Sequence, residues 1–198
     1  MVYTVRVNVK HDKEKVLSKG IELFWSKGYN SLGVAEICET TGMTKGAFYN
    51  AFESKENFLL EGIKSYGDSS AITQQALLSS GGDKAIDRLQ NFYDKMFNFQ
   101  SKMNYRGCLV VNMVSELSTE HPTVRKAVAI ELDRFIANIE PIVREAQEAG
   151  DLKSDIDSVE LTKLIHSTFM GTLTRAKSLK SNVAGKKTMK LLINSLSK

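Results

Sequence analysis

The sequence predicts an all-α protein of about nine helices, and three observations carry this prediction. The 198 residues include only two prolines and 13 glycines, a composition that favours long helices over a loop-rich β fold. Apolar residues recur at helical spacing along most of the chain. Glycine and serine interrupt these stretches, most clearly at Ser79-Ser80-Gly81-Gly82.

The first predicted helix covers residues 12–27 and ends at Gly28. Three apolar residues at helical spacing form its inner face: Leu17, Ile21 and Phe24. Residues 1–11 alternate as in a strand, but an isolated strand has nothing to pair with in a helical protein. We therefore expect residues 1–11 to form a disordered arm.

Residues 34–52 are predicted to form a helix, a glycine turn and a short second helix. Gly42 supplies the positive φ that ends the first helix, and Thr44 is suited to cap the second. Helix, glycine turn and short helix form the pattern of a helix-turn-helix DNA reader. Any two short helices joined by a glycine turn share part of this pattern, so the pattern alone leaves DNA binding open.

The second of these helices separates apolar from polar side chains. The residues expected to turn inward are Ala47, Phe48 and Phe52. The residues expected outside are Lys45, Tyr49 and Asn50. Outward Lys, Tyr and Asn side chains suit phosphate oxygens and base edges. If residues 1–11 also reach DNA, Arg6 and Lys10 would enter a minor groove.

Six further helices follow along the chain, over residues 54–78, 83–103, 107–119, 123–148, 156–180 and 185–197. The helix over 83–103 is rich in aromatic and methionine side chains, among them Phe92 and Met96. Such side chains are typical of plain core packing. They also form the walls of pockets for apolar ligands, and both interpretations stay open here.

The N-terminal third closely resembles the TetR family of transcriptional regulators. Three segments carry the resemblance, in order and at the family's spacing: Gly28-Tyr29, Val34-Ala35-Glu36-Ile37 and Thr44 to Glu56. The resemblance implies a three-helix helix-turn-helix domain over residues 1–53 and an effector-sensing and dimerisation domain over 54–198. It implies operator DNA as a partner, with contacts from Ser31, Thr44, Lys45, Gly46, Tyr49, Asn50 and Lys55.

The sequence departs from the family pattern at Leu32 and Gly33, where the family often has a phosphate-binding Thr and a helix cap. Ser31 or Asn30 could take over such a contact. The resemblance also implies a homodimer, in which the helices over about 156–180 and 185–197 pair with their copies. Two recognition helices would then reach two major grooves, ~34 Å or somewhat more apart.

A second informative block begins at Arg106-Gly107-Cys108-Leu109. Cys108 is predicted in the first turn of a helix and beside Arg106. A helix N-terminus and a nearby cation both favour the thiolate, which reacts with electrophiles and oxidants. A buried cysteine would instead be an inert apolar residue.

The Gly-Cys-Leu sequence resembles the N-ethylmaleimide-sensing (NemR-type) branch of the TetR family. The resemblance implies that Cys108 senses electrophiles or oxidants, with Lys177 as its partner. The same sequence also resembles branches that bind small acids or apolar drugs, and a structural role of the cysteine is the alternative there. The candidate sensing residues are Cys108, Lys177, Arg106, Phe92, Met96 and Met113.

Several classes of protein find no support in the sequence. The longest apolar runs, such as residues 108–111, are too short to span a membrane, and the first residues lack the apolar core expected of a signal peptide. With two cysteines and no disulfide framework, we expect a cytoplasmic protein. The three histidines share no metal-ligand spacing, so neither a metal nor a cofactor is expected. Catalytic motifs are missing as well, so no catalytic residue is assigned.

Charge alone would place the nucleic-acid-binding surface in the C-terminal residues of the chain. The net charge is +4, yet residues 161–198 carry eight Lys and Arg and no Asp or Glu. We give the helix-turn-helix pattern more weight, because a few well-placed contacts outweigh net charge. The sequence thus predicts a homodimeric repressor released from its operator by a small molecule, electrophile or oxidant. The alternative is release by a reversible apolar or small-acid ligand, and a cysteine-dependent enzyme is a remote third.

Overall fold

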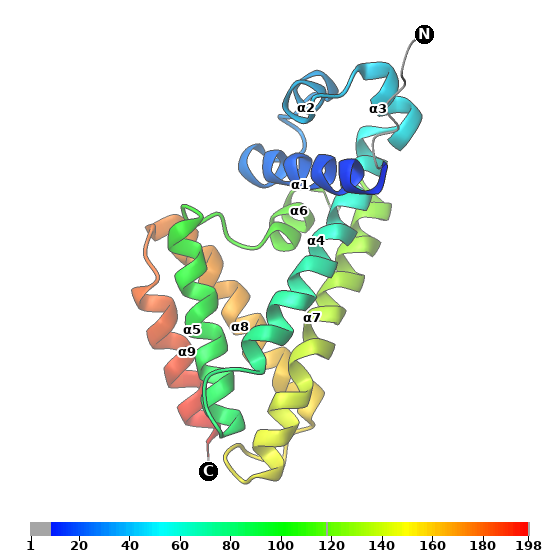
Figure 1. The fold of residues 1–198 in the computed structure, drawn as a ribbon. Coiled ribbons are helices and arrows are strands. Elements are labelled where there is room, and N and C mark those ends of the chain that lie inside the picture. Colours follow the sequence, from blue (N-terminus) through cyan, green and yellow to red (C-terminus); the bar gives the residue numbers. More distant parts are fainter. Residues whose placement is uncertain (1–8, 118, 198) are drawn as a thin grey trace. The chain divides into compact units, whose positions relative to one another are not determined.

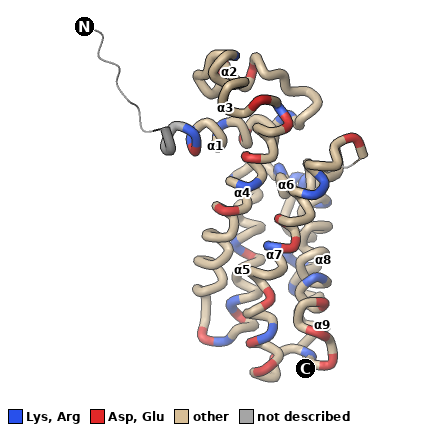
Figure 2. The backbone as a smooth tube through the Cα atoms, turned by 90° about the vertical axis from the view of Figure 1, so that its right-hand side faces the viewer, with Lys and Arg blue, Asp and Glu red and all other residues tan. Residues whose placement is uncertain are grey.

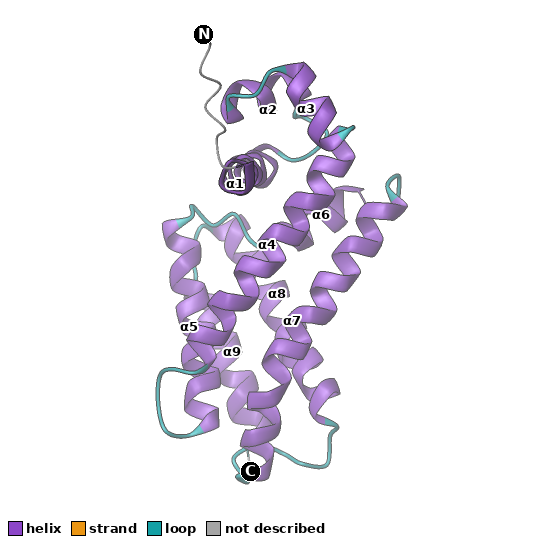
Figure 3. Ribbon diagram, turned by 45° about the vertical axis from the view of Figure 1, so that its right-hand side comes forward, coloured by secondary structure: helices purple, strands orange, loops and turns teal. Residues whose placement is uncertain are grey.

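The computed structural model describes residues 9–117 and 119–197, which fold into nine α-helices (Figure 1). In chain order these are α1 (Val9–Lys27), α2 (Val34–Thr41), α3 (Lys45–Phe52), α4 (Lys55–Leu78), α5 (Ala85–Lys102), α6 (Leu109–Leu117), α7 (Pro122–Glu148), α8 (Ser158–Leu179) and α9 (Val183–Leu196). Figure 3 shows helices and loops and no strand in this described part. The predicted all-α class and number of helices are confirmed.

The first helix begins earlier than the sequence predicted. α1 starts at Val9, so residues 9–11, which we expected in the disordered arm, are helical. Lys10 is therefore a helical residue rather than part of an extended arm. Residues 1–8 lie outside the described part of the chain, and the minor-groove arm with Arg6 remains a prediction.

The chain divides into two compact units. The first unit holds the chain up to Asp68 together with Asn112–Val128, and the second holds Ser69–Val111 and Ala129–Lys198. This division differs from the boundary between residues 53 and 54 that the sequence suggested. The reason is that Phe58, at 0% exposure, and the neighbouring apolar residues of α4 are buried in the core of the first unit.

Phe58 is the centre of that first core. Its ring lies 4.7 Å from the ring of Phe52, 5.2 Å from that of Phe48 and 5.9 Å from that of Phe24, measured between centroids. The three partners come from α3 and α1, so one residue of α4 joins the helices of the reader. Gly20 of α1 permits this arrangement, because a Cβ at that position would overlap the Phe58 ring.

The core of the second unit is built on the aromatic face of α5. Phe92 and Phe97 are buried there, and Phe97 meets Phe169 of α8 with ring centroids 5.1 Å apart. Gly185 lets α9 approach this face, because a Cβ on it would come within 2.7 Å of Phe97. The close approach of three helices thus depends on the smallest side chain.

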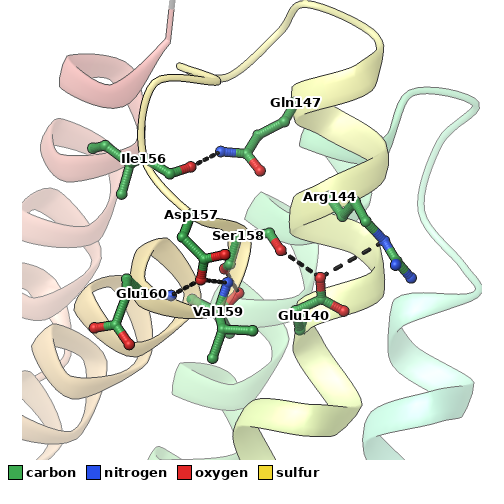
Figure 4. Close-up of polar contacts among 9 residues, drawn as sticks. Glu140, Arg144, Gln147, Ile156, Asp157, Ser158, Val159 and Glu160 are labelled. Atoms are coloured by element: carbon green, nitrogen blue, oxygen red, sulfur yellow. Dashed lines mark hydrogen bonds and ion pairs between the residues drawn. The ribbon is translucent and has the colours of Figure 1, made fainter.

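The connection from α7 to α8 is fixed by side-chain caps (Figure 4). Asp157 accepts hydrogen bonds from the backbone N–H groups of Val159, at 3.0 Å, and Glu160, at 3.1 Å. Ser158 donates to Glu140 of α7 at 2.6 Å. These bonds satisfy the first N–H groups of α8 and tie its start to α7.

Candidate DNA-binding surface and candidate sensing site

The two reader helices have the local geometry that their sequence predicts. Gly42 adopts φ 79°, and its N–H bonds to the carbonyl of Cys38, which ends α2. Thr44 precedes α3, and its hydroxyl accepts a hydrogen bond from the N–H of Ala47 at 3.1 Å. A left-handed glycine and a side-chain cap therefore set the turn between the two helices.

The outer face of α3 is exposed. Tyr49 is 48% exposed, and its ring packs edge-on against buried Phe48 at 5.5 Å. The other candidate DNA contacts in this region are exposed as well: Ser31, Thr44, Lys45, Gly46 and Asn50. Ala47, which we expected to be buried, is also exposed, because Phe48 and Phe52 define the inner face and residue 47 lies about 100° away around the helix.

Lys55 differs from the other candidates. Its ammonium donates to the carbonyl oxygens of Tyr29, at 3.0 Å, and Leu32, at 2.9 Å, and lies 3.9 Å from the centre of the Tyr29 ring. Burial lowers the pKa of the Lys55 amine, and the nearby Glu116 carboxylate partly opposes this shift. In this geometry Lys55 holds the turn between α1 and α2, and a contact between Lys55 and a phosphate remains a prediction.

Glu116 binds the same turn from the end of α6. Its carboxylate accepts hydrogen bonds from the backbone N–H groups of Tyr29, at 3.0 Å, and Asn30, at 2.8 Å. Gly28 leaves room for it, because a Cβ at that position would lie 2.9 Å from a carboxylate oxygen and the backbone has φ 80°. Sequence patterns missed this residue, because its partners lie 86 and 87 positions away.

A further polar group joins the start of α4 to the start of α7. Glu56 accepts hydrogen bonds from Thr123 and from His121, the latter at 2.8 Å. Both bonds lower the pKa of the Glu56 carboxyl, and the bond from Thr123 contributes most. The His121 ring in turn packs edge-on against Tyr29 with centroids 5.2 Å apart. The turn after α1 is thus held by α4, α6 and α7 within the first unit.

The predicted sensing residues do not all belong to one unit. Cys108, Arg106, Lys177, Phe92 and Met96 belong to the second unit, whereas Met113 is buried in the first. Cys108 is 7% exposed and forms no disulfide. It lies immediately before α6, one residue outside the helix that we expected to contain it.

The backbone before Cys108 is fixed by Gln100 of α5. The Gln100 amide accepts from the N–H of Gly107 at 2.9 Å and donates to its carbonyl at 3.3 Å. Gly107 has φ 77°, which favours glycine. The bend that brings the chain from α5 into α6 is therefore held by a buried side chain.

Two polar side chains of the second unit lie inside an aromatic cluster that the sequence did not reveal. Tyr93 of α5 is 1% exposed and His166 of α8 is 4% exposed. Their ring centroids lie 6.2 Å apart, and His166 also contacts Phe135 at 6.1 Å and Phe169 at 5.8 Å. Burial lowers the pKa of His166 to about 4 and raises the pKa of Tyr93. His166 is therefore a neutral imidazole at pH 7.

Neither a metal site nor a membrane-spanning helix is found among the described residues. No group of three or more His, Cys, Asp or Glu side chains that could hold a metal ion is found in residues 9–117 and 119–197. None of the described helices has the length and apolar character needed to cross a bilayer.

Basic and acidic residues both mark the helices of the second unit (Figure 2). Part of the basic charge of residues 161–198 is engaged locally. Lys163 pairs with Glu160 at 2.7 Å, and Lys186 donates to Asn98 at 2.7 Å.

Comparison with known families matches both units. Residues 85–192 match the family described as "Tetracyclin repressor-like, C-terminal domain", and residues 16–61 match "Bacterial regulatory proteins, tetR family". Three similar proteins carry names of transcriptional regulators. The repressor DhaR of Mycobacterium sp. strain GP1 is 26% identical, over 83% of this chain and 82% of its own. AcuR of Cereibacter sphaeroides is 31% identical, over 83% and 75%. The repressor NemR of Escherichia coli K12 is 24% identical, over 88% of each.

Solved structures agree with this assignment. A regulatory protein TetR from Rhodobacter sphaeroides superposes with a TM-score of 0.85 at 26% identity, covering 96% of this chain and all of that one. The reduced form of E. coli NemR superposes with a TM-score of 0.83 at 22% identity, covering 94% and 97%, which shows a shared fold. Since the first family match alone spans more than half of the chain, the protein belongs to the TetR family of bacterial regulatory proteins.

Proposed function

We propose that the protein is a homodimeric transcriptional repressor that binds operator DNA through α3 and leaves the DNA when an effector acts on the second unit. The observation that carries the proposal is the exposed face of α3, where Lys45, Tyr49 and Asn50 lie over buried Phe48 and Phe52. A rigid helix with polar groups outside suits a major groove. The names of the relatives as repressors support regulation rather than catalysis.

The DNA-binding part of the proposal is tested by replacing Tyr49. Double-stranded fragments that the full-length protein retains are first selected from a random pool, and binding is then measured by gel shift. We expect Tyr49→Ala to weaken binding at least tenfold, or about 1.4 kcal/mol, because the proposal assigns the exposed phenol a contact with the DNA. Phe99→Ala is the control, since Phe99 is a 44% exposed aromatic residue on α5. Unchanged binding by Tyr49→Ala would remove α3 as the reader.

Release of the DNA has a candidate route through α6. Cys108 lies immediately before this helix, and Glu116 lies near its other end, where it binds the turn after α1. Eight residues of helix span about 12 Å. Chemical modification of Cys108 would displace the start of α6, and the same rigid helix carries the carboxylate that holds the reader. A tenfold loss of DNA affinity needs only about 1.4 kcal/mol of differential stabilisation.

Substitution of Cys108 distinguishes this route from reversible ligand binding. We expect Cys108→Ser to bind DNA like the native protein and to stay bound after treatment with N-ethylmaleimide, while the native protein is released. Cys38→Ala serves as the matched control, because Cys38 is also a buried thiol. Intact mass measurement reports how many thiols have reacted. If N-ethylmaleimide releases Cys108→Ser from the DNA, Cys108 is not the sensing residue, and a reversible ligand in the second unit is favoured.

A further inference from the structure

Tyr93 and His166 are buried polar side chains that no protein group pairs with in the described structure. The phenolic oxygen of Tyr93 and both ring nitrogens of His166 lie inside the second unit without a hydrogen-bond partner. These three polar atoms come from two helices, α5 and α8, that face each other. Buried polar atoms in native proteins are nearly always paired, because each unpaired one costs about 1–3 kcal/mol. Three such atoms at one place therefore indicate a bound partner.

The surroundings define the chemistry of that partner. Phe135 and Phe169 contact the His166 ring, and Phe92 packs edge-on against Tyr93 at 4.9 Å. Aromatic walls suit a flat apolar body. The side chains whose rings contact His166 are uncharged, so a buried carboxylate or ammonium would find no opposite charge among them. A neutral molecule fits the cluster better than an ion.

The hydrogen-bonding capacity of Tyr93 and His166 further limits which neutral molecules would fit. A neutral imidazole offers one N–H donor and one acceptor nitrogen, and a phenol offers a donor and an acceptor on one oxygen. A hydroxyl group on the ligand can donate to one of these two side chains and accept from the other, and a carbonyl group can accept from both. One such group on the ligand would pair with the Tyr93 oxygen and with one ring nitrogen of His166, and the other ring nitrogen would need a second polar atom of the ligand or a water molecule.

We infer that the aromatic cluster of α5, α7 and α8 binds a small neutral molecule with an aromatic or unsaturated body and one hydroxyl or carbonyl group, held by Tyr93 and His166. The inference rests on the proposed function only in identifying this molecule as the effector. Binding itself involves the second unit and needs no DNA.

The test uses the full-length protein and phenol as the probe, with toluene and benzoate as matched compounds that lack the hydroxyl or carry a charge. Isothermal titration calorimetry at pH 7 should show phenol binding at least tenfold tighter than toluene or benzoate. Tyr93→Phe and His166→Leu should each reduce the preference for phenol over toluene at least fivefold. Tyr105→Phe makes the same chemical change at a half-buried tyrosine outside the cluster and should leave the preference unchanged.

A second measurement keeps the inference testable if a variant binds nothing. Removing an unpaired buried hydroxyl should not destabilise the protein without ligand, so Tyr93→Phe should raise the midpoint of thermal unfolding or leave it unchanged. A lower midpoint, or equal affinity for phenol and toluene in the native protein, would overturn the inference. Binding of phenol without release of selected DNA fragments would leave the site intact and count against the effector role alone.

Discussion

His166 shows how a single residue makes the stability of the fold depend on pH. Burial lowers its pKa to about 4 from the ordinary value of 6.5, so between these values the unfolded chain binds more protons than the native protein. The free energy of unfolding is therefore highest above pH 6.5 and decreases as the pH falls towards 4. The shift corresponds to about 3 kcal/mol in total, of which about 2 kcal/mol is lost between pH 7 and pH 5.

This prediction is tested by urea unfolding of the native protein and His166→Leu at pH 7, 6 and 5. The variant has no imidazole to protonate at this position and is otherwise identical in sequence, so the difference between the two proteins reports on His166. We expect the native protein to lose about 2 kcal/mol more than the variant over this range. A difference between the two proteins that stays constant from pH 7 to pH 5 would contradict the buried, neutral state of His166.

Residues with local roles were predictable, and residues with distant partners were not. Gly42 and Thr44 act within their own turn, so sequence spacing was enough to assign both. Lys55 was expected on DNA because the family resemblance carries no information about the two carbonyls that it reaches 23 and 26 positions away. The sequence did not indicate that His166 is buried. Its burial depends on Tyr93 of α5 and Phe135 of α7 as well as on Phe169 of its own helix, and periodicity does not bring separate helices together.

At the scale of a helix, the last turn of α6 stabilises the helix-turn-helix region through Glu116. Glu116 accepts two hydrogen bonds from the turn after α1, and no other acceptor is seen for these N–H groups among the described residues. We expect Glu116→Ala to increase the amide hydrogen exchange rates of Tyr29 and Asn30 at least tenfold, because their N–H groups lose their acceptor. The free energy of unfolding should fall by about 1 kcal/mol, since the carboxylate is partly exposed.

Two internal references make the exchange measurement specific. The N–H of Gly42 bonds to the carbonyl of Cys38 at the end of α2 and should exchange at an unchanged rate. Glu120→Ala removes an exposed carboxylate close in sequence and should leave Tyr29 and Asn30 protected. Equal protection of these two amides in Glu116→Ala and the native protein would show that α6 does not hold the turn.

Helix boundaries were the most predictable feature at this scale. The glycine turn predicted within residues 34–52 lies at Gly42 in the structure, and the ends of α4, α5 and α7 lie within two residues of their predicted positions. Composition and caps set these boundaries locally. What the sequence did not indicate is which helices share a core. The grouping of Phe58 with α1 and α3 depends on packing at Gly20, which no local pattern signals.

At the scale of the whole molecule, the outer faces of α8 and α9 are the expected dimer interface. Leu164 of α8 is 46% exposed and Leu191 of α9 is 69% exposed. Between them in sequence, Gly171 leaves open space where a Cβ would point, so another helix could approach closely. TetR-family regulators act as dimers, and exposed apolar side chains on paired helices are typical of such interfaces.

Arginine at both leucines should separate the subunits. In a two-fold interface each substitution occurs twice, so the double variant Leu164→Arg, Leu191→Arg loses the burial of four leucines and gains four close positive charges. We expect the dissociation constant of the dimer to rise at least 100-fold, and sedimentation velocity at about 10 µM to show the mass of one chain. Binding to selected DNA fragments should be lost with it, since one recognition helix reaches one half-site.

The control for this experiment is Ile130→Arg, which places the same charge at a 61% exposed apolar residue of α7. This variant should remain dimeric and bind DNA, because α7 is not part of the expected interface. If Ile130→Arg is monomeric while the double variant stays dimeric, the subunits pair through α7 instead of α8 and α9. If the double variant is monomeric yet binds DNA with native affinity, a single reader is sufficient and the spacing of two half-sites cannot be the quantity that an effector changes.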